Sequence, residues 1–306
     1  MRPMNEHTAT VLSDWPSYSR DLKQCGYSPD VDFVCPICGE TCSCPTKPIS
    51  VSKGHIIPAA FGGISTVLVC KQCEDFMGHS IEAPLIKLVK DGRAIYGRAD
   101  GIVRGRFRIK TDTGPAHAHL RFSGNNGWTI HFPKPGDMER VFPDAKPGPI
   151  VEPPRLEFAL AFDKPRVDRS LRLTVLKVAY LASFKWLGYA YVLRRELAWV
   201  GKKLRGQPVD RPYVYSMSLP GKAYTLRMPG YDQLALRESH VALFSGTAAE
   251  LPVLLGFVQL QNMQHLAVLP PPAGGVTLEQ LRDKLGTGDG RTAYVAFDPR
   301  PAVIVV

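Results

Sequence analysis

CPICG at residues 35–39 and CKQC at residues 70–73 are the two stretches that decide the fold of the first quarter of this 306-residue chain. Each places two thiols three residues apart, the spacing of a zinc knuckle, and Gly39 lets the backbone turn back toward a metal ion. Zinc takes four ligands in a tetrahedron, and apparent binding energies of about 10 to 16 kcal/mol can hold together a module with a small core. The pattern therefore predicts one structural zinc ion bound by Cys35, Cys38, Cys70 and Cys73.

The remaining cysteines leave an alternative ligand set open. Cys42 and Cys44 are separated by one residue, a spacing less suited to chelating a single zinc ion, but either can substitute for Cys38 or contribute to a second site. Cys25 is interpreted as a small hydrophobic residue. In a reducing compartment, clustered cysteines bind metal more often than they form disulfides, which favours a zinc site here.

The segment that contains these pairs resembles the HNH endonuclease family, in its zinc-knuckle branch. The resemblance is carried by CPICG, by GHIIPAAFGG at residues 54–63 and by VCKQCEDFMGHSIEAPL at residues 69–85, and it covers residues 33–88. It implies a ββα-metal fold, with His55 near the end of the first strand of a hairpin and a helix that begins near Cys70 to Cys73. It also implies that His55 deprotonates a water that attacks a phosphodiester, while a divalent ion stabilises the leaving oxygen.

Two positions depart from the family pattern. Gly54 stands where the family usually has an Asp, Glu or His metal ligand, and Glu74 stands where it usually has a helix asparagine. A carboxylate suits Mg or Mn, so Glu74 is the first candidate ligand for a catalytic divalent ion. Asp75 and His79 are four residues apart and share one face of a helix, which makes them the next candidates.

The net charge of +10 favours a polyanionic partner, and the resemblance implies that this partner is DNA. Eleven Lys or Arg residues lie between residues 164 and 205, against two acidic ones. The candidate nucleic-acid contacts are Lys53, Lys71, Arg194 and Arg195. Since there is no phosphate loop and no GxGxxG that opens a helix after a strand, a nucleotide cofactor has no support.

The sequence favours a cytoplasmic protein over a secreted or membrane-spanning one. Its first twenty residues lack the continuous apolar core of a signal peptide, so a cytoplasmic location with reduced thiols is expected. The apolar run at residues 171–193 is interrupted by Lys177 and Lys185. A buried core helix is therefore favoured over a membrane span. The oligomeric state is not predicted.

We expect an α+β fold, in which an N-terminal ββα-metal zinc module is followed by an antiparallel-sheet-rich region with one long buried helix. The predicted segments are a lead-in at 1–30, the HNH-like zinc module at 31–90, an antiparallel β region at 91–132, a proline-rich linker or loop at 133–154, and a C-terminal α+β domain of unknown role at 155–306. Seven prolines in residues 133–154 argue against helix there. Strands are expected at 156–162, 224–228, 241–244, 253–260, 266–269, 294–297 and 303–306, with a short helix at 278–285.

These patterns predict a metal-dependent HNH-type endonuclease that acts on DNA, with His55 as general base, Glu74 helping to hold Mg or Mn, and zinc as scaffold. The alternative is a catalytically impaired HNH-like zinc module that binds nucleic acid or a partner protein, which the missing ligand at Gly54 favours. The histidine at position 55 argues for the enzyme, because a scaffold needs no imidazole there. A weaker third hypothesis makes residues 155–306 a sensing domain that controls the nuclease.

Overall fold

The computed structural model describes residues 6–42, 51–95, 101–109, 116–122, 128–132, 134–141, 158–160, 164–209, 214–215, 239–248, 251–261, 263–272, 295–297 and 303–305. The chain divides into two compact units, Met1–Glu82 with Arg169–Val306, and Ala83–Asp168. Both units combine helices with antiparallel strands, which confirms the predicted α+β class. The five-segment organisation that the sequence suggests stays a prediction.

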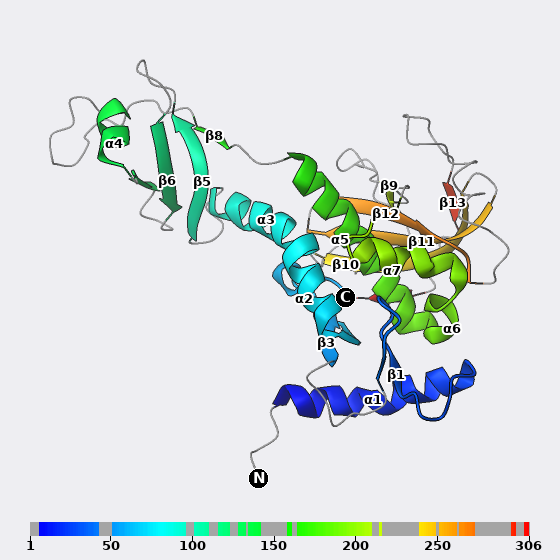
Figure 1. The fold of residues 1–306 in the computed structure, drawn as a ribbon. Helices are drawn as coiled ribbons and strands as arrows, with labels where there is room; N and C mark the ends of the chain where they lie inside the picture. Colours follow the sequence, from blue (N-terminus) through cyan, green and yellow to red (C-terminus); the bar gives the residue numbers. More distant parts are fainter. Residues whose placement is uncertain are drawn as a thin grey trace, which may run out of the picture. The chain divides into compact units, whose positions relative to one another are not determined.

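The predicted ββα arrangement is present in the first unit (Figure 1). Strands β3 (Val51–His55) and β4 (Thr66–Cys70) pair in antiparallel register, with His55 opposite Thr66. Helix α2 (Lys71–Phe76) follows β4 directly and continues as the π-helical turn η3 (Met77–Glu82). The hairpin thus carries His55 at the end of its first strand, and the helix begins next to Cys70, as the resemblance implied.

The connection between β3 and β4 depends on two glycines. A short 3-10 turn, η2 (Ala59–Phe61), ends at Gly62, whose φ of 85° lies in the left-handed region that favours glycine. A Cβ at Gly63 would collide with the backbone carbonyl of Ile57. Ile57 and Phe61 are buried, so the Gly62-Gly63 turn lets the loop fold onto its own core.

A helix occupies most of the segment that the sequence suggested was only a lead-in. Helix α1 (Glu6–Gln24) packs Trp15 against Phe33, with ring centroids 5.6 Å apart. Phe33 belongs to β1 (Phe33–Val34), which pairs with β2 (Thr41–Cys42) to form the knuckle hairpin. The weak apolar periodicity of this segment concealed a helix that forms part of the core.

The C-terminal part of the first unit is a set of helices and an antiparallel sheet. The helices are α5 (Lys164–Leu187, which begins in the second unit), α6 (Tyr189–Val192), the 3-10 turn η5 (Arg195–Leu197) and α7 (Ala198–Leu204). The strands are β9 (Val214–Tyr215), β10 (Ser239–Ala248), β11 (Leu251–Leu260), β12 (Met263–Leu269), β13 (Val295–Phe297) and β14 (Val303–Val305). The sheet order is β13-β10-β11-β12-β9, with β14 also paired to β10.

Helix α5 packs closely on this sheet. A Cβ at Gly256 in β11 would lie 2.6 Å from the Cβ of Ala179, so the two small residues allow helix and strand to approach. From Leu173 to Phe184 every residue of α5 is buried, which confirms the prediction of a buried core helix. Among the residues that the structure describes, no helix is long and apolar enough to cross a membrane.

Most of the strands predicted for this region are found. Strands β10, β11, β12, β13 and β14 cover the described parts of the predicted segments, whereas the single helix expected over residues 171–193 is divided at Gly188 into α5 and α6. The predicted strand at 224–228 and helix at 278–285 lie outside the described residues. The two-residue strand β9 was not predicted.

The second unit, Ala83–Asp168, confirms the predicted antiparallel sheet. It contains α3 (Ala83–Ile95), β5 (Gly101–Ile109), β6 (Ala116–Phe122), β7 (Trp128–His131), α4 (Pro135–Val141) and β8 (Phe158–Leu160). The strand order is β7-β6-β5-β8. The expectation that residues 133–154 lack helix is wrong for α4, because a proline at the first helical position needs no hydrogen-bonded N–H and already has a helical φ.

Candidate metal centre and active site

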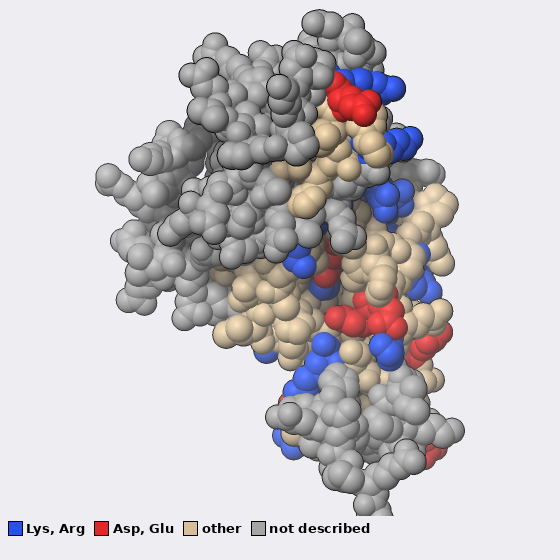
Figure 2. Space-filling view, turned by 90° about the vertical axis from the view of Figure 1, so that its left-hand side faces the viewer, with Lys and Arg blue, Asp and Glu red and all other residues tan. Residues whose placement is uncertain are grey.

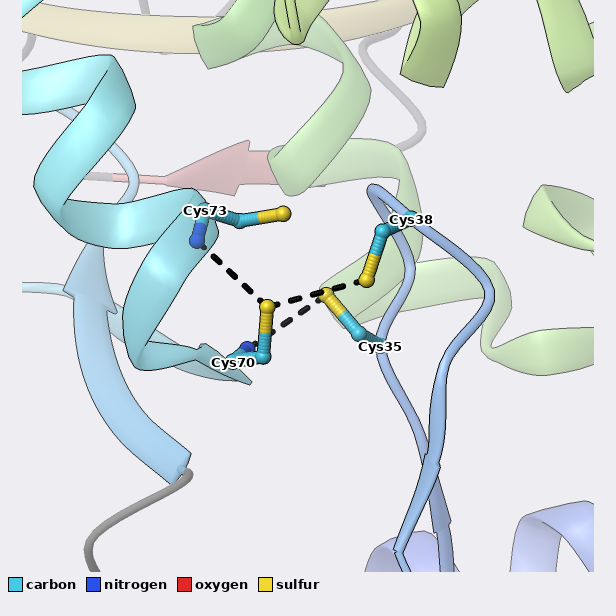
Figure 3. Close-up of side chains that lie close together, drawn as sticks. All are labelled: Cys35, Cys38, Cys70 and Cys73. Atoms are coloured by element: carbon cyan, nitrogen blue, oxygen red, sulfur yellow. Dashed lines mark hydrogen bonds between the residues drawn. The ribbon is translucent and has the colours of Figure 1, made fainter.

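Four cysteine side chains converge in the first unit (Figure 3). The Sγ atoms of Cys35, Cys38, Cys70 and Cys73 all lie within 4.8 Å of one another, and those of Cys38 and Cys70 are 3.6 Å apart. A tetrahedral zinc site with Zn–S bonds of about 2.3 Å separates its sulfurs by roughly 3.8 Å. The geometry and the soft thiol donors therefore fit one zinc ion, as the spacing predicted.

Local backbone geometry aims the four thiols at one point. In the knuckle loop, Cys35 N–H donates to the carbonyl of Glu40 at 2.9 Å, and Gly39 closes the turn with a φ of 76°. On the other side, Cys70 caps the N-terminus of α2, where its Sγ accepts from the Cys73 N–H at 3.4 Å. The Cys70 N–H in turn donates to the Sγ of Cys35 at 3.4 Å. Knuckle and helix are thus joined through sulfur.

The electrostatics of the cluster suit a metal-bound thiolate. Hydrogen bonds from the thiols of Cys38, Cys70 and Cys73 lower the pKa of Cys35. The same contacts raise the pKa values of Cys70 and Cys73, so the positive charge of a zinc ion would be needed to hold all four sulfurs as thiolates. Cys42 ends β2 with a side chain that is not described, and Cys44 lies outside the described residues. The alternative ligand roles of these two cysteines stay predictions.

The knuckle is held in place by helices more than a hundred residues away in sequence. The Tyr180 hydroxyl of α5 donates to the carbonyl of Pro36 at 2.7 Å, and the Tyr189 hydroxyl of α6 donates to that of Val34 at 2.7 Å. A Cβ at Gly201 in α7 would collide with the carbonyl of Ile37. The metal module therefore shares its core with α5–α7 and does not depend on zinc alone.

His55, the predicted general base, is the last residue of β3 and is half-buried. The hairpin continues beyond it, because Ile56 N–H donates to the Ser65 carbonyl at 2.9 Å. Ile56 is fully buried, which fixes the backbone that presents His55. The histidine therefore occupies a defined position at the end of the strand.

Glu74 covers Gly54. An ideal Cβ on Gly54 would collide with the Oε2 atom of Glu74 and would lie 2.9 Å from Cγ2 of Val69. The Glu74 carboxylate therefore fills the space in which the family's usual ligand side chain at position 54 would begin. Its Oε2 is buried and has no hydrogen-bond partner among the described residues, and burial raises the pKa of the carboxyl group.

An orphaned buried carboxylate oxygen is an appropriate donor for a hard divalent ion. Among the described residues, the cysteine cluster is the one group of three or more His, Cys, Asp or Glu side chains whose ligand atoms converge, so the structure offers a single oxygen of Glu74 to such an ion. His55 follows Gly54 on the same strand, although no hydrogen bond joins His55 to Glu74 in the part of the chain that the structure describes.

A second buried carboxylate lies near Glu74 and was missed by the sequence analysis. Glu82, at the end of η3, forms an ion pair with Lys177 of α5, and their side chains are 10% and 2% exposed. Both groups act electrostatically on Glu74, Lys177 lowering its pKa and Glu82 raising it. The interruption of an apolar helix by Lys177 was the available signal, because a buried ammonium group requires an anionic partner.

Asp75 and His79 lie on the exposed surface of α2 and η3. The Asp75 carboxylate pairs with Lys71 at 3.0 Å. His79 Nδ1 is 2.8 Å from the backbone oxygen of Asp75, which can only accept, so Nδ1 carries the proton and Nε2 is left as the nitrogen able to bind a metal. The structure does not bring either side chain into contact with Glu74.

The four candidate nucleic-acid contacts have different surroundings. Lys53 pairs with Asp14 at 2.7 Å, and Lys71 pairs with Asp75. Arg194 donates to the carbonyls of Pro271 and Pro272 at 2.6 and 2.9 Å, whereas Arg195 is exposed. On the face drawn in Figure 2, the described Lys and Arg side chains lie in separate groups interleaved with Asp and Glu, without a continuous basic patch.

Comparison with known proteins identifies the segment around the cysteine cluster. No curated protein and no solved structure matches the chain. The family model described as HNH endonuclease matches residues 35–90. This segment contains all four clustered cysteines, the β3–β4 hairpin, α2 and η3. Residues 35–90 are thus similar in sequence to an HNH endonuclease module, which confirms the resemblance found for residues 33–88, and this match supports a nuclease-type family with a cysteine cluster suited to zinc.

Proposed function

We propose that this protein is a metal-dependent HNH-type endonuclease that hydrolyses phosphodiester bonds in DNA. The observation that carries the proposal is the position of the Glu74 carboxylate over Gly54, with a buried oxygen that lacks a hydrogen-bond partner. It answers the main objection to activity, which is the missing ligand at position 54. The charge of +10 and the match to the HNH endonuclease family support a nucleic-acid substrate.

His55 is proposed as the general base. A neutral imidazole accepts a proton near pH 7, and general base catalysis contributes about 10²- to 10⁴-fold to rate. His55 takes a proton from water as the water oxygen forms a bond to phosphorus, and the bond between phosphorus and the leaving oxygen breaks. The fixed end of β3 orients the imidazole for this step.

Glu74 is proposed as the main protein ligand of a divalent ion, with His79 and Asp75 as weaker candidates because both are exposed. When bound, Mg or Mn supplies positive charge that offsets the charge growing on the phosphate oxygens. The raised pKa of Glu74 and its buried oxygen both indicate a carboxylate that gains from cation binding. Zinc at the cysteines has a structural role, because four protein ligands leave no open position for substrate.

Cleavage assays test this proposal directly. Supercoiled and linear DNA are incubated with the wild-type protein and with His55→Ala, in Mg, in Mn and in EDTA. We expect cutting that requires Mg or Mn and falls by about 10²-fold or more in His55→Ala. Glu74→Gln should raise the metal concentration for half-maximal activity by at least about tenfold. His131→Ala, which alters an exposed histidine of β7, is the matched control and should cut normally.

The second candidate function is a zinc-stabilised binding module without nuclease activity. Gly54, which offers no side-chain ligand, and the lack of a hydrogen bond between His55 and Glu74 among the described residues favour it. In that case wild-type and His55→Ala proteins would retard DNA equally and leave it intact in every metal. Equal cutting by both proteins would refute the role of His55 while leaving a nuclease with another base.

A further inference from the structure

The end of helix α5 lies against the hairpin that carries His55. Lys185 Nζ donates to the Ser65 hydroxyl at 2.7 Å and to the Thr66 carbonyl at 3.4 Å. Thr66 is the residue opposite His55 in the β3–β4 pair. Lys185, which lies in a helix outside the segment matched by the family model, therefore contacts the residue that pairs with the proposed general base.

Two exposed hydrophobic side chains flank this contact. The large hydrophobic side chains exposed in the described part of the chain are Tyr27, Ile64, Met138 and Trp186. Ile64 is 75% exposed and directly precedes Ser65, whereas Trp186 is 42% exposed and directly follows Lys185. Single exposed hydrophobic residues are common on protein surfaces, but two of the four found in the described part of the chain adjoin the two ends of one hydrogen bond, and this clustering points to a contact surface.

The charge of Lys185 indicates the kind of partner. Lys53 in β3 and Lys71 in α2 each pair with an aspartate. Both hydrogen-bond partners of Lys185 are neutral, and the residue is exposed, so its positive charge is available to an incoming anion. A lysine between a tryptophan and an isoleucine suits a DNA strand, which presents phosphates to the lysine and the faces of bases to the apolar side chains.

We infer that Ile64, Lys185 and Trp186 form a DNA-docking surface beside His55. This inference rests on the proposed function and adds the binding contacts to it. Lys185 contacts a phosphate next to the one that is cut, Trp186 stacks on a base of a single-stranded or distorted segment, and Ile64 contacts the same strand from the loop between β3 and β4. Helix α5 therefore contributes substrate contacts to a module whose chemistry lies in residues 35–90.

Binding measurements in a catalytically inactive background separate docking from chemistry. Full-length His55→Ala protein is titrated into labelled duplex DNA and labelled single-stranded DNA, followed by fluorescence anisotropy over a range of salt concentrations. Adding Trp186→Ala should weaken binding by about 5- to 100-fold, with the larger effect on single strands. Adding Lys185→Gln, which keeps a donor for Ser65, should reduce the slope of log affinity against log salt by about one. Adding Ile64→Ser should weaken binding by a smaller factor.

Lys23→Ala and Tyr27→Ala are the matched controls, because they alter an exposed lysine and an exposed aromatic residue beside α1. They should bind DNA as the parent does. Unchanged affinity in Trp186→Ala and Lys185→Gln would overturn the inference even if the wild type cuts DNA. Loss of a protein dimer in Trp186→Ala, seen by size-exclusion chromatography with DNA affinity unchanged, would also overturn it. Selective loss of DNA binding in a protein that never cuts would refute the nuclease proposal and uphold this surface.

Discussion

The cysteine cluster and the Gly54–Glu74 contact differ in how complete their ligand sets are. Four thiols surround one point on the cysteine side, within 4.8 Å of one another. On the other side a single carboxylate oxygen is buried without a hydrogen-bond partner among the described residues. Structural zinc sites are closed by four protein ligands, whereas catalytic sites keep positions open for water and substrate. The contrast teaches that the four cysteines form a closed ligand set suited to a scaffold metal, whereas the proposed reactive metal rests on one carboxylate of the chain.

Both regions receive support from the C-terminal helices, but in different ways. Tyr180 and Tyr189 hold the backbone of the knuckle through neutral hydrogen bonds. Near Glu74, α5 instead supplies the buried charge of Lys177. A neutral support affects stability alone, while a charged support also changes the field at the carboxylates. Variants of Tyr180 or Tyr189 should therefore alter stability alone, whereas variants of Lys177 should also alter the electrostatics at Glu74.

Loss of zinc should produce the largest effect. Chelation of the wild type, or Cys70→Ser, removes an interaction with an apparent binding energy of about 10 to 16 kcal/mol. We expect a large fall in the midpoint of the thermal transition of the first unit and one released zinc per chain, measured by calorimetry and by a colorimetric zinc assay. Cys25→Ser, which changes a cysteine outside the cluster, should keep both zinc and the transition. Full zinc content in Cys70→Ser would contradict the ligand set.

Breaking the buried ion pair of Lys177 with Glu82 should have the second-largest effect on stability. Lys177→Met leaves the Glu82 carboxylate buried without its partner, which typically costs about 3 to 5 kcal/mol in the free energy of unfolding. Chemical denaturation of the zinc-loaded protein measures this cost. The double variant Lys177→Met with Glu82→Leu should recover most of it, because two apolar side chains need no charge partner.

The ion pair of Lys164 with Asp168 on the same helix provides the matched control. It is exposed, with side chains that are 74% and 41% accessible, and such pairs contribute only a few tenths of a kcal/mol. Lys164→Met should therefore leave the free energy of unfolding nearly unchanged. If Lys164→Met and Lys177→Met reduce the free energy of unfolding equally, burial does not explain the contribution of the Lys177–Glu82 pair to stability.

Substitutions at positions 54 and 74 test whether the Glu74 carboxylate on the helix replaces the ligand that the family usually carries on the strand at position 54. Gly54→Asp alone places its side chain into Glu74 Oε2 and should displace the helix carboxylate. A misplacement of about 1 Å can reduce activity on the order of 100-fold. Adding Glu74→Asn to Gly54→Asp restores the usual family pattern and relieves the collision. We expect the double variant to cut DNA more rapidly than either single variant in Mg.

The control for this exchange is Gly78→Asp, since a Cβ at Gly78 meets no atom within 4 Å. It adds the same side chain to the neighbouring helical turn without a collision, and should retain activity. If the double variant is as inactive as Gly54→Asp, the Glu74 carboxylate does not replace a ligand at position 54. Cleavage rates and the metal concentration for half-maximal activity provide the measurement.

The sequence was most informative where chemistry restricts spacing. Two Cys-x-x-Cys pairs predicted the cluster, because metal geometry allows few arrangements of four thiols, and the resemblance to the HNH family implied the hairpin and the start of α2. Alternation of apolar residues likewise predicted the antiparallel strands of both units. These features are encoded by residues close together in the chain.

Features that depend on distant residues could not be predicted in the same way. The pairing of Lys177 with Glu82 joins positions 95 residues apart, and no local pattern identifies the partner. The close approach of the Glu74 carboxylate to Gly54 depends on the distance between helix α2 and strand β3. Helix α1 was missed because its apolar residues pack on the knuckle hairpin, and tertiary contacts compensate for weak periodicity.

The smallest expected effect concerns the neutral support of the knuckle. Tyr180→Phe removes the hydroxyl that donates to the Pro36 carbonyl, which should cost about 1 kcal/mol in the free energy of unfolding. Zinc stoichiometry and DNA cleavage should both stay at the wild-type level, because no charge near Glu74 changes. Tyr27→Phe, at an exposed tyrosine, is the matched control and should have no measurable cost. A change in metal dependence in Tyr180→Phe would show that the two regions are coupled through α5, so that the scaffold metal and the reactive site are not independent.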